Sequence, residues 1–357
     1  MICINDNFRL MPDGKIYEGG LVRNQAIIMW FRNNISDYKE VRLTKGRIKN
    51  ALKVLYTLIK EKNEKIFFFY PTVGIPIVKN GILGRVSRMI FFVIVNKSIK
   101  RNQIYFDICD LKYEQSIDLN IDKEREKAFK QCEKYLFRLS AKYNFASESM
   151  KIYAQKKYGI ADKQVGTLIN GGNLYENTKR DLKIDTHKIN CVYAGTLNRG
   201  RQIEEMIKSF PKSECMHLYL LGVNGEWIRE RDNIHYLGKM SEEDAHNFAV
   251  QCDLGLIPYD QERLYYNLAY PTKLSFYITA GIPFLGTPVI EIEKIHIKEN
   301  VGYVYKLEEW GTFLRTVTKE KLLKEKDKIM SIEDNYLWDT VCNENTFLAE
   351  LKNNTIN

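Results

Sequence analysis

The stretch NLAYPTKLSFYITAGIPFLGTP, residues 267–288, has the local pattern of a helix that leads into a buried strand. Pro271 sets the start of the helix, and Gly281 and Pro283 end it and begin the strand. Such a corner is typical of α/β proteins. Lys273 falls in the first turn, where a cation is unfavourable for the helix dipole unless an anion lies between them. The stretch therefore indicates a structural corner that mildly favours an anionic ligand.

Segments typical of strands alternate with helical segments along the whole chain. This alternation indicates βαβ units and predicts an α/β fold of two doubly wound domains. A strong turn signal, NGGN at residues 170–173, marks the boundary between them. The predicted strands are 2–4, 65–70, 103–108 and 142–147, then 190–194, 217–221, 234–237, 252–257, 283–286 and 301–304, and the predicted helices are 48–60, 121–139, 204–210, 242–251 and 274–280.

The composition is that of a folded soluble protein, with 45% hydrophobic and 28% charged residues in 357. The N-terminus lacks the pattern of a signal peptide, and the longest apolar run, residues 89–95, is far below the roughly 20 residues that span a bilayer. The seven cysteines form no C-x-x-C pair and the five histidines no H-x-x-x-H pair. We therefore expect a cytoplasmic protein without a metal or other cofactor.

Positive charge is concentrated in the first part of the chain. Residues 1–100 contain 18 Lys and Arg against seven Asp and Glu, whereas the whole chain has a net charge of +9. This asymmetry favours an anionic partner, either nucleic acid or an acidic membrane surface. Residues 78–102 mix basic residues with seven consecutive apolar ones, which fits either an amphipathic helix on anionic lipid or a core helix with basic ends. No recognised nucleic-acid-binding pattern accompanies the charge, so we expect peripheral membrane contact.

Two further segments follow strands and open helices. VYAGTLNRGRQIEEM, residues 192–206, places Arg199 and Arg201 in a Gly-containing loop, which suits either a diphosphate or an ordinary turn with solvated arginines. It matches neither G-x-G-x-x-G nor a P-loop. Residues 235–260 contain a capping box, Ser241 with Asp244, and a loop against which a base could lie, although a purely structural role fits them as well.

Taken in order, VYAGTL, YLLG, IHYLGKMSEEDAHNFAVQCDLGLIPY and PTKLSFYITAGIPFLGT resemble the donor domain of GT-B-fold glycosyltransferases. The resemblance is greatest to family-4-like enzymes and to the galactofuranosyl- and glucosyltransferases of bacterial surface glycans. INDNFRLMPDGKIYEGGLVRNQAII resembles their first strand, an acceptor-side loop with Gly19 and Gly20, and a helix. DNYLWDTVCNENTFLAELK resembles their C-terminal crossover helix, with Trp338 as its anchor.

The resemblance implies two Rossmann-like domains that face each other across a cleft. The acceptor-side domain would cover residues 1–168, with the crossover helix at 335–357, and the donor domain would cover 169–334. The donor's diphosphate would contact Arg199 and Lys273 beside Thr272. Its base and ribose would lie against Gly195, Tyr236, Leu237, Tyr259 and Ser275.

One departure from the family pattern affects the mechanism. Retaining family-4 enzymes carry a pair of glutamates, E-x7-E, at positions that correspond here to Leu268 and Phe276. A different ribose contact must replace them, and retention of configuration does not follow from the resemblance.

An inverting enzyme also needs a base in the first domain to accept the proton of the acceptor hydroxyl. Asp110 is the first candidate and Asp13 the second, with Asp6 and Asp107 behind them, and each could instead be a turn or cap carboxylate. We expect a metal-independent glycosyltransferase that uses a UDP-sugar to extend a glycan, glycoprotein glycan or lipid-linked acceptor of a bacterial surface. A non-catalytic glycan- or nucleotide-binding subunit is the alternative, and homo-oligomerisation stays open.

Overall fold

The computed structural model describes residues 1–5, 19–44, 46–72, 74–76, 81–175 and 184–352. Contacts within the chain divide it into two compact units. One unit holds most of the first 169 residues together with the chain from Cys342 onward, and the other holds Asn170–Val341.

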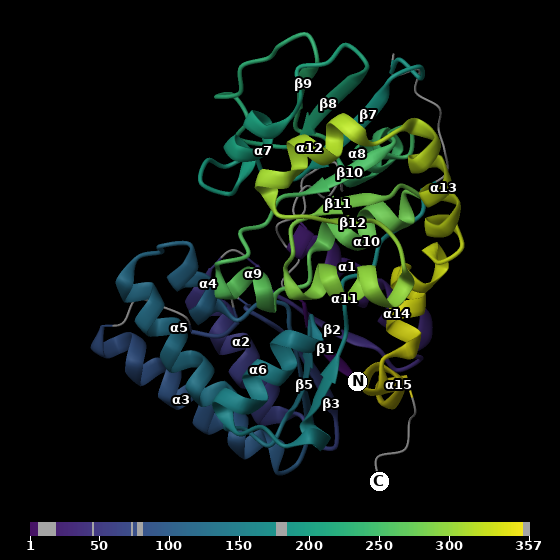
Figure 1. The fold of residues 1–357 in the computed structure, drawn as a ribbon. Helices are drawn as coiled ribbons and strands as arrows, with labels where there is room; N and C mark the ends of the chain where they lie inside the picture. The colour runs from purple at the N-terminus through teal and green to yellow at the C-terminus, as the bar shows by residue number, and fades with distance from the viewer. Residues whose placement is uncertain (6–18, 45, 73, 77–80, 176–183, 353–357) are drawn as a thin grey trace. The chain divides into compact units, whose positions relative to one another are not determined.

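The first unit contains a sheet of six parallel strands in the order β2-β1-β3-β4-β5-β6, flanked by helices (Figure 1). Right-handed crossovers place α1 on one face of this sheet and α2, α3, α5 and α6 on the other. Its elements are β1 (Ile2–Asn5), α1 (Gly19–Asn34), β2 (Lys39–Arg42), α2 (Arg47–Lys60), β3 (Lys65–Tyr70), α3 (Ile82–Ile99), β4 (Gln103–Ile108), α4 (Lys112–Asp118), α5 (Lys123–Leu136), β5 (Lys142–Phe145), α6 (Glu148–Tyr158), a 3-10 turn (Asp162–Gln164) and β6 (Val165–Thr167).

The centre of this sheet is built from continuous apolar strands. All six residues of β3 are buried, and Phe68 stacks on Phe106 of the neighbouring β4 with ring centres 5.0 Å apart. A strand covered by helices on both faces needs apolar residues at every position, which explains the unbroken KIFFFY pattern.

The second unit contains six parallel strands in the order β12-β11-β10-β7-β8-β9, the classical Rossmann arrangement. The direction of winding changes between β7 and β10, which pair with each other. Its elements are β7 (Ile189–Ala194), α7 (Ile203–Ser209), β8 (Met216–Leu221), β9 (Ile234–Gly238), α8 (Glu242–Ala249), β10 (Leu254–Ile257), α9 (Leu264–Leu268), α10 (Thr272–Thr279), β11 (Phe284–Gly286), α11 (Ile290–Glu299), β12 (Tyr303–Val304), a 3-10 turn (Leu307–Glu309), α12 (Trp310–Thr316), α13 (Lys319–Met330) and a 3-10 turn (Glu333–Tyr336).

Ser241 of the predicted capping box is the N-cap of α8. The Ser241 hydroxyl accepts a hydrogen bond from the Asp244 backbone N–H at 3.1 Å and lies 2.7 Å from the Asp244 carboxylate. This pairing satisfies a donor that the first helical turn would otherwise leave unpaired.

The C-terminal segment differs from the expected single helix over 335–357. It forms two short helices, α14 (Trp338–Glu344) and α15 (Thr346–Lys352). Trp338 lies on the second unit, where its backbone N–H donates to the Gly172 carbonyl at 3.1 Å.

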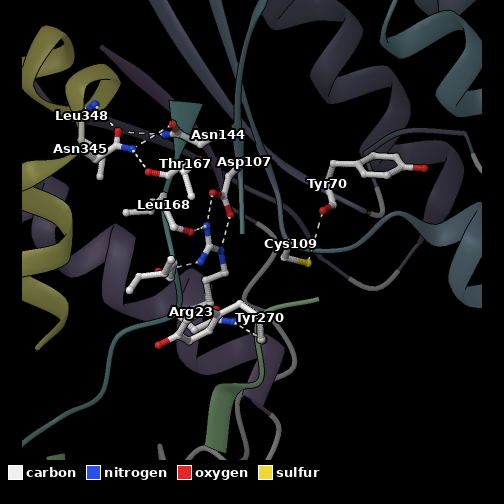
Figure 2. A network of polar contacts seen from close by, with 12 residues as sticks. Arg23, Tyr70, Asp107, Cys109, Asn144, Thr167, Leu168, Tyr270, Asn345 and Leu348 are labelled. Atoms are coloured by element: carbon white, nitrogen blue, oxygen red, sulfur yellow. Dashed lines mark hydrogen bonds and ion pairs between the residues drawn. The ribbon is translucent and has the colours of Figure 1, made fainter. Parts of the chain in front are cut away.

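Residues beyond Val341 belong to the first unit. Asn345 exchanges hydrogen bonds with Asn144 of β5 at 3.0 and 3.1 Å (Figure 2). Asn343 accepts a hydrogen bond from the Trp30 indole at 3.0 Å. This pairing fixes the last described helix to the first sheet. Throughout the described part of the chain, no helix is both long and apolar enough to cross a bilayer.

Candidate functional site

The winding change between β7 and β10 marks the place where ligands bind in open parallel sheets, at the carboxyl ends of the strands. The loop after β7 runs through Gly195 to Gln202, and the loop after β10 runs through Tyr259. Both loops therefore leave the sheet at neighbouring positions. Lys273, in the first turn of α10, lies over the first of them.

Gly195 makes room for the lysine. Its φ of 151° is a conformation that side-chain-bearing residues rarely adopt, and a methyl group added there would lie 2.7 Å from Lys273 Nζ. The Gly195 carbonyl is also packed so tightly against Gly222 that a methyl on Gly222 would lie 1.8 Å from it. The backbone at this point of the loop is therefore held closely between β8 and α10.

The Lys273 ammonium lies among aromatic rings. Nζ is 4.8 Å from the ring centre of Tyr193 and 5.7 Å from that of Tyr259. Among the described residues it forms no ion pair with a carboxylate. Loss of hydrating water, followed by the positive charge of Arg201, lowers the pKa of Lys273 to about 8. An anionic ligand beside such a cation would stabilise its charge.

Tyr277 holds the helix that carries the lysine. It lies four residues after Lys273 and hence on the same helix face. Its buried hydroxyl lies 3.1 Å from the Ala194 backbone N–H and 3.2 Å from the Val192 carbonyl, both in β7. Its ring packs directly on Gly255 of β10, where an added methyl would lie 2.4 Å away. The Tyr277 side chain thus connects α10 to both β7 and β10, the two strands at the winding change.

Two arginines extend the positive charge along the loop after β7. The guanidinium of Arg199 lies 4.7 Å from the ring centre of Trp227, whose indole N–H donates to the Leu197 carbonyl at 2.8 Å. Arg201 is the side chain whose charge acts on Lys273. The loop therefore carries two cations near the carboxyl end of β7. The family resemblance in the sequence had assigned a diphosphate contact only to Arg199. Thr272, the first residue of α10, is exposed beside Lys273.

The residues predicted to contact the base and ribose differ in their surroundings. Tyr236 packs on Gly225, and its hydroxyl donates to the Gly222 carbonyl at 3.2 Å, so it supports the loop after β8. Leu237 is exposed. Tyr259 stacks on Tyr266 with ring centres 4.7 Å apart, beside the lysine.

Ser275 does not have the environment of a ligand-binding residue. It is fully buried, its hydroxyl donates to the Asn170 carbonyl at 2.6 Å, and it lies 2.8 Å from the Tyr270 hydroxyl. These bonds fix the start of α10 to the beginning of the second unit. Its place among the predicted ribose contacts is therefore not supported by the structure.

The positions of the missing glutamates are occupied by packing residues. Leu268 is buried, and the Phe276 ring meets His246 edge-to-face with ring centres 5.5 Å apart. Neither side chain can accept a hydrogen bond from a ribose hydroxyl.

In the first unit, Asp107 is committed to a buried ion pair. Figure 2 shows Arg23 of α1 reaching both carboxylate oxygens of Asp107, at 2.6 and 2.8 Å, and donating to the Leu168 carbonyl at 2.8 Å. Burial opposes the charge on the guanidinium, but Asp107 outweighs it and raises the pKa of Arg23. Asp107 therefore connects α1 to the end of β4, and both of its carboxylate oxygens are occupied by Arg23, which argues against Asp107 as the base.

Asp110 lies in the loop that follows β4 and is partly exposed. Its carboxylate accepts a hydrogen bond from Lys112 at 2.8 Å. Burial disfavours the charged lysine, but Asp110 outweighs this effect and raises the pKa of Lys112. Asp13 and Asp6 lie outside the described residues, and Gly19 and Gly20 are the first two residues of α1.

In the described parts of the chain, no group of three or more His, Cys, Asp or Glu side chains is arranged to hold a metal ion.

Comparisons with known proteins agree with this arrangement. Residues 191–336, which lie within the second unit, match the family described as "Glucosyltransferase 3-like, C-terminal domain". Residues 191–336 thus form a glucosyltransferase 3-like C-terminal domain, and the chain as a whole has the GT-B fold.

Two of the similar solved structures cover nearly the whole chain. HepE from Anabaena, in complex with UDP-glucose, has a TM-score of 0.63 at 10% identity over 98% of each chain. Sucrose-phosphate synthase from Thermosynechococcus elongatus has a TM-score of 0.66 at 11% identity over 95% of each chain. WaaG, a glycosyltransferase involved in lipopolysaccharide biosynthesis, has a TM-score of 0.53 at 15% identity over 81% of this chain and 92% of its own. No curated protein sequence matches significantly.

The sequence did not single out three of the side chains that lie around Lys273 in the structure. Tyr193 and Tyr277 are buried and look like ordinary core residues in the sequence. A signal for Tyr277 was present, since it follows Lys273 at helical spacing while β10 carries a glycine that leaves space for a ring. Arg201 was noted in its loop but not assigned, because its proximity to Lys273 depends on tertiary structure.

Proposed function

We propose that this protein is a glycosyltransferase, and that it moves a sugar from a nucleoside diphosphate sugar, a UDP-sugar, to a glycan, a glycoprotein glycan or a lipid-linked acceptor of a bacterial surface. The observation that supports a diphosphate donor most strongly is Lys273, a poorly hydrated cation over Gly195 at the winding change of the second sheet. HepE, whose fold is similar, has been solved with UDP-glucose, which supports uridine as the base.

In the proposed reaction, the cations around Lys273 lie beside the leaving group, which is the nucleoside diphosphate. As the bond between the sugar's anomeric carbon and the diphosphate oxygen breaks, negative charge develops on the diphosphate. Lys273, Arg201 and Arg199 would stabilise that charge, which is the role that metal ions play in other transferases. We therefore propose that turnover does not depend on a divalent metal, and that it persists in the presence of EDTA.

The acceptor's hydroxyl oxygen forms the new bond to the anomeric carbon, and its proton must pass to a base. Asp110 remains our proposed base, since it is partly exposed after a strand of the first sheet. Replacing Asp110 with Asn should lower kcat by at least about a hundredfold and leave the UDP-sugar dissociation constant unchanged. A loss of donor affinity instead would remove Asp110 from this role.

Leu268 and Phe276 favour an alternative function, a non-catalytic binding subunit, because they leave the ribose without the expected carboxylates. A non-catalytic subunit that only binds a nucleotide or glycan would keep the cationic loop and lose turnover. Slow hydrolysis of a UDP-sugar, measured by release of UDP, distinguishes the two. A binding subunit would show saturable binding and no release.

The donor can be identified by a thermal-shift screen of UDP-, GDP-, dTDP- and CMP-sugars. A ligand that binds the native state raises its stability by about 2.7 kcal/mol at a concentration one hundred times its dissociation constant. We expect UDP-sugars to give the largest rise. A larger rise with another nucleotide would overturn the choice of uridine, and no rise with any of them would overturn the proposal.

A further inference from the structure

Two neighbouring helices of the first unit expose an unusual number of large apolar side chains. Of the 21 such exposed residues in the described chain, ten lie on α2 and α3 alone. The most exposed are Leu83 at 87%, Ile82 at 81% and Ile48 at 79%. We call the ten residues the α2–α3 face: Ile48, Leu52, Tyr56, Ile59, Ile82, Leu83, Val86, Met89, Ile90 and Val93.

The face is a continuous feature of both helices. Its α2 members, at positions 48, 52, 56 and 59, and its α3 members, between 82 and 93, recur every three to four residues and so form one stripe on each helix. A second stripe on each helix is buried, as Val54 and Leu58 in α2 and Phe91 and Val95 in α3 show. The two helices contact each other, and each carries its exposed stripe beside a buried one.

The charges that α2 and α3 themselves carry have one sign. Neither α2 nor α3 contains a single Asp or Glu. Exposed lysines stand among and beside the apolar residues, including Lys49, Lys53 and Lys60 on α2 and Lys97 on α3. Apolar stripes bordered by lysines are the pattern of helices that lie in the interface of an anionic bilayer.

We propose that the α2–α3 face docks on the surface of a bilayer that contains anionic lipid. The aliphatic side chains enter the boundary between headgroups and acyl chains, and the lysines meet lipid phosphates. This interaction does not depend on the proposed glycosyl transfer. It specifies a surface of two helices, of which the sequence had indicated only α3.

The charges favour lipid over a second copy of the chain. A symmetric dimer through this face would bring the two basic surfaces together, and like charges in contact oppose association. They also favour lipid over nucleic acid, since ten exposed aliphatic and aromatic side chains contribute nothing to phosphate binding.

The test is co-sedimentation of the full-length protein with phosphatidylcholine vesicles, with and without phosphatidylglycerol. Wild type should bind only the anionic vesicles appreciably, and more weakly at high salt. Two substitutions together on α3, Leu83→Gln and Ile90→Gln, should weaken binding at least about tenfold. Lys49→Gln with Lys97→Gln should weaken it about twenty-fivefold, since each cation near such a surface contributes about fivefold.

A matched control is Ile297→Gln on α11, which removes a side chain of 78% exposure from the second unit. It should bind like wild type. Equal binding by the Leu83→Gln, Ile90→Gln variant and wild type would overturn the proposal. So would a wild-type oligomer that this variant converts to monomer without any vesicle binding, because the face would then be a contact between copies. Thermal unfolding of each variant establishes that it is folded.

Discussion

At the scale of single residues, Lys273 is a poorly hydrated cation whose position should lower the stability of the folded protein. Its ammonium is desolvated between Tyr193 and Tyr259 and close to the charge of Arg201, without a carboxylate partner among the described residues. Burial of a charge without an opposite partner is unfavourable, and it persists in proteins chiefly where a ligand supplies the partner. The residue thus breaks a local rule of folding at the place where a ligand is expected.

Replacing Lys273 with Met should therefore stabilise the ligand-free protein. We expect the free energy of unfolding to rise by about 1 kcal/mol, a value that allows for partial exposure of the side chain. Urea unfolding at neutral pH measures it. Lys212→Met is the matched control, an exposed lysine in the connection between α7 and β8, and should change little. A destabilised Lys273→Met protein would mean that the ammonium is already well paired.

Donor binding should depend on pH through the same residue. The pKa of free Lys273 is about 8, and a bound diphosphate would raise it, so binding is strongest when the lysine is protonated. Affinity for UDP-glucose should be level below pH 8 and fall by up to about tenfold per pH unit above it. Titrations between pH 7 and 9.5 test this, and Lys273→Arg should flatten the profile.

Folding stability should change in the opposite direction over part of this range. Because the folded pKa of Lys273 is below its ordinary value of 10.5, the unfolded chain binds more protons between about pH 8 and 10.5. Stability contributed by this residue therefore rises with pH across that window. Ligand binding and stability should thus respond to alkaline pH with opposite signs.

At the scale of secondary-structure elements, α10 is held in place by the Tyr277 hydroxyl. Tyr277→Phe would leave the Ala194 N–H without this partner and should cost about 1–3 kcal/mol of folding stability. Because Lys273 lies one turn away, UDP-glucose affinity should also fall. Tyr305→Phe, with a more exposed hydroxyl on the same unit, is the control for both measurements. Unchanged affinity in Tyr277→Phe would show that Lys273 is positioned by other contacts.

A second element-scale device lies in the first unit. The buried Glu133 of α5 accepts hydrogen bonds from Tyr70 at the end of β3, from the Tyr113 N–H of α4 and from Tyr158 of α6. Loss of hydration, followed by the nearby Glu114 carboxylate, raises the pKa of Glu133 to about 8. The folded state therefore holds a proton that the unfolded state has lost above about pH 4.5.

The raised pKa of Glu133 predicts the direction in which folding stability changes with pH. The contribution of Glu133 is fully present below about pH 4.5 and is lost as pH rises through about 8. Glu133→Gln, which is neutral at every pH, should be more stable than wild type at pH 9 and similar to it at pH 5. Urea unfolding at both values measures the difference, with the exposed Glu320→Gln as control. Equal differences at pH 5 and pH 9 would contradict it.

Secondary structure was predictable where burial is uniform and less so at sheet edges. The continuous apolar run of β3 was identified from sequence, whereas β2 (KEVR) and β6 (VGT) were missed. An edge strand is covered less and so carries charged or small residues, which removes the apolar signal. The roles of the residues around Lys273 were also hard to predict from sequence, because they depend on tertiary packing. Ser275 and Tyr277 are both polar residues of α10. Only the structure shows that their hydroxyls donate to backbone carbonyls, those of Asn170 and Val192, and so have structural roles.

At the scale of the whole molecule, the two units share one architecture and differ in surface chemistry. The second carries the cationic loop at its winding change, and the first carries the basic, apolar α2–α3 face. The alternation of strands and helices predicted two doubly wound domains, and the resemblance of the ordered motifs to GT-B enzymes predicted the GT-B fold. The proposed ligand rests on that resemblance together with the charge around Lys273, since fold alone does not determine function.

Calorimetric titration of UDP-glucose into the full-length protein, compared with Lys273→Met and Lys212→Met, tests the central claim most directly. We expect wild type and Lys212→Met to bind with the same affinity. Lys273→Met should bind at least about tenfold more weakly, because a charge-assisted contact to the diphosphate contributes about 1.5–3 kcal/mol. Equal affinity in all three proteins would contradict a role for Lys273 in donor binding.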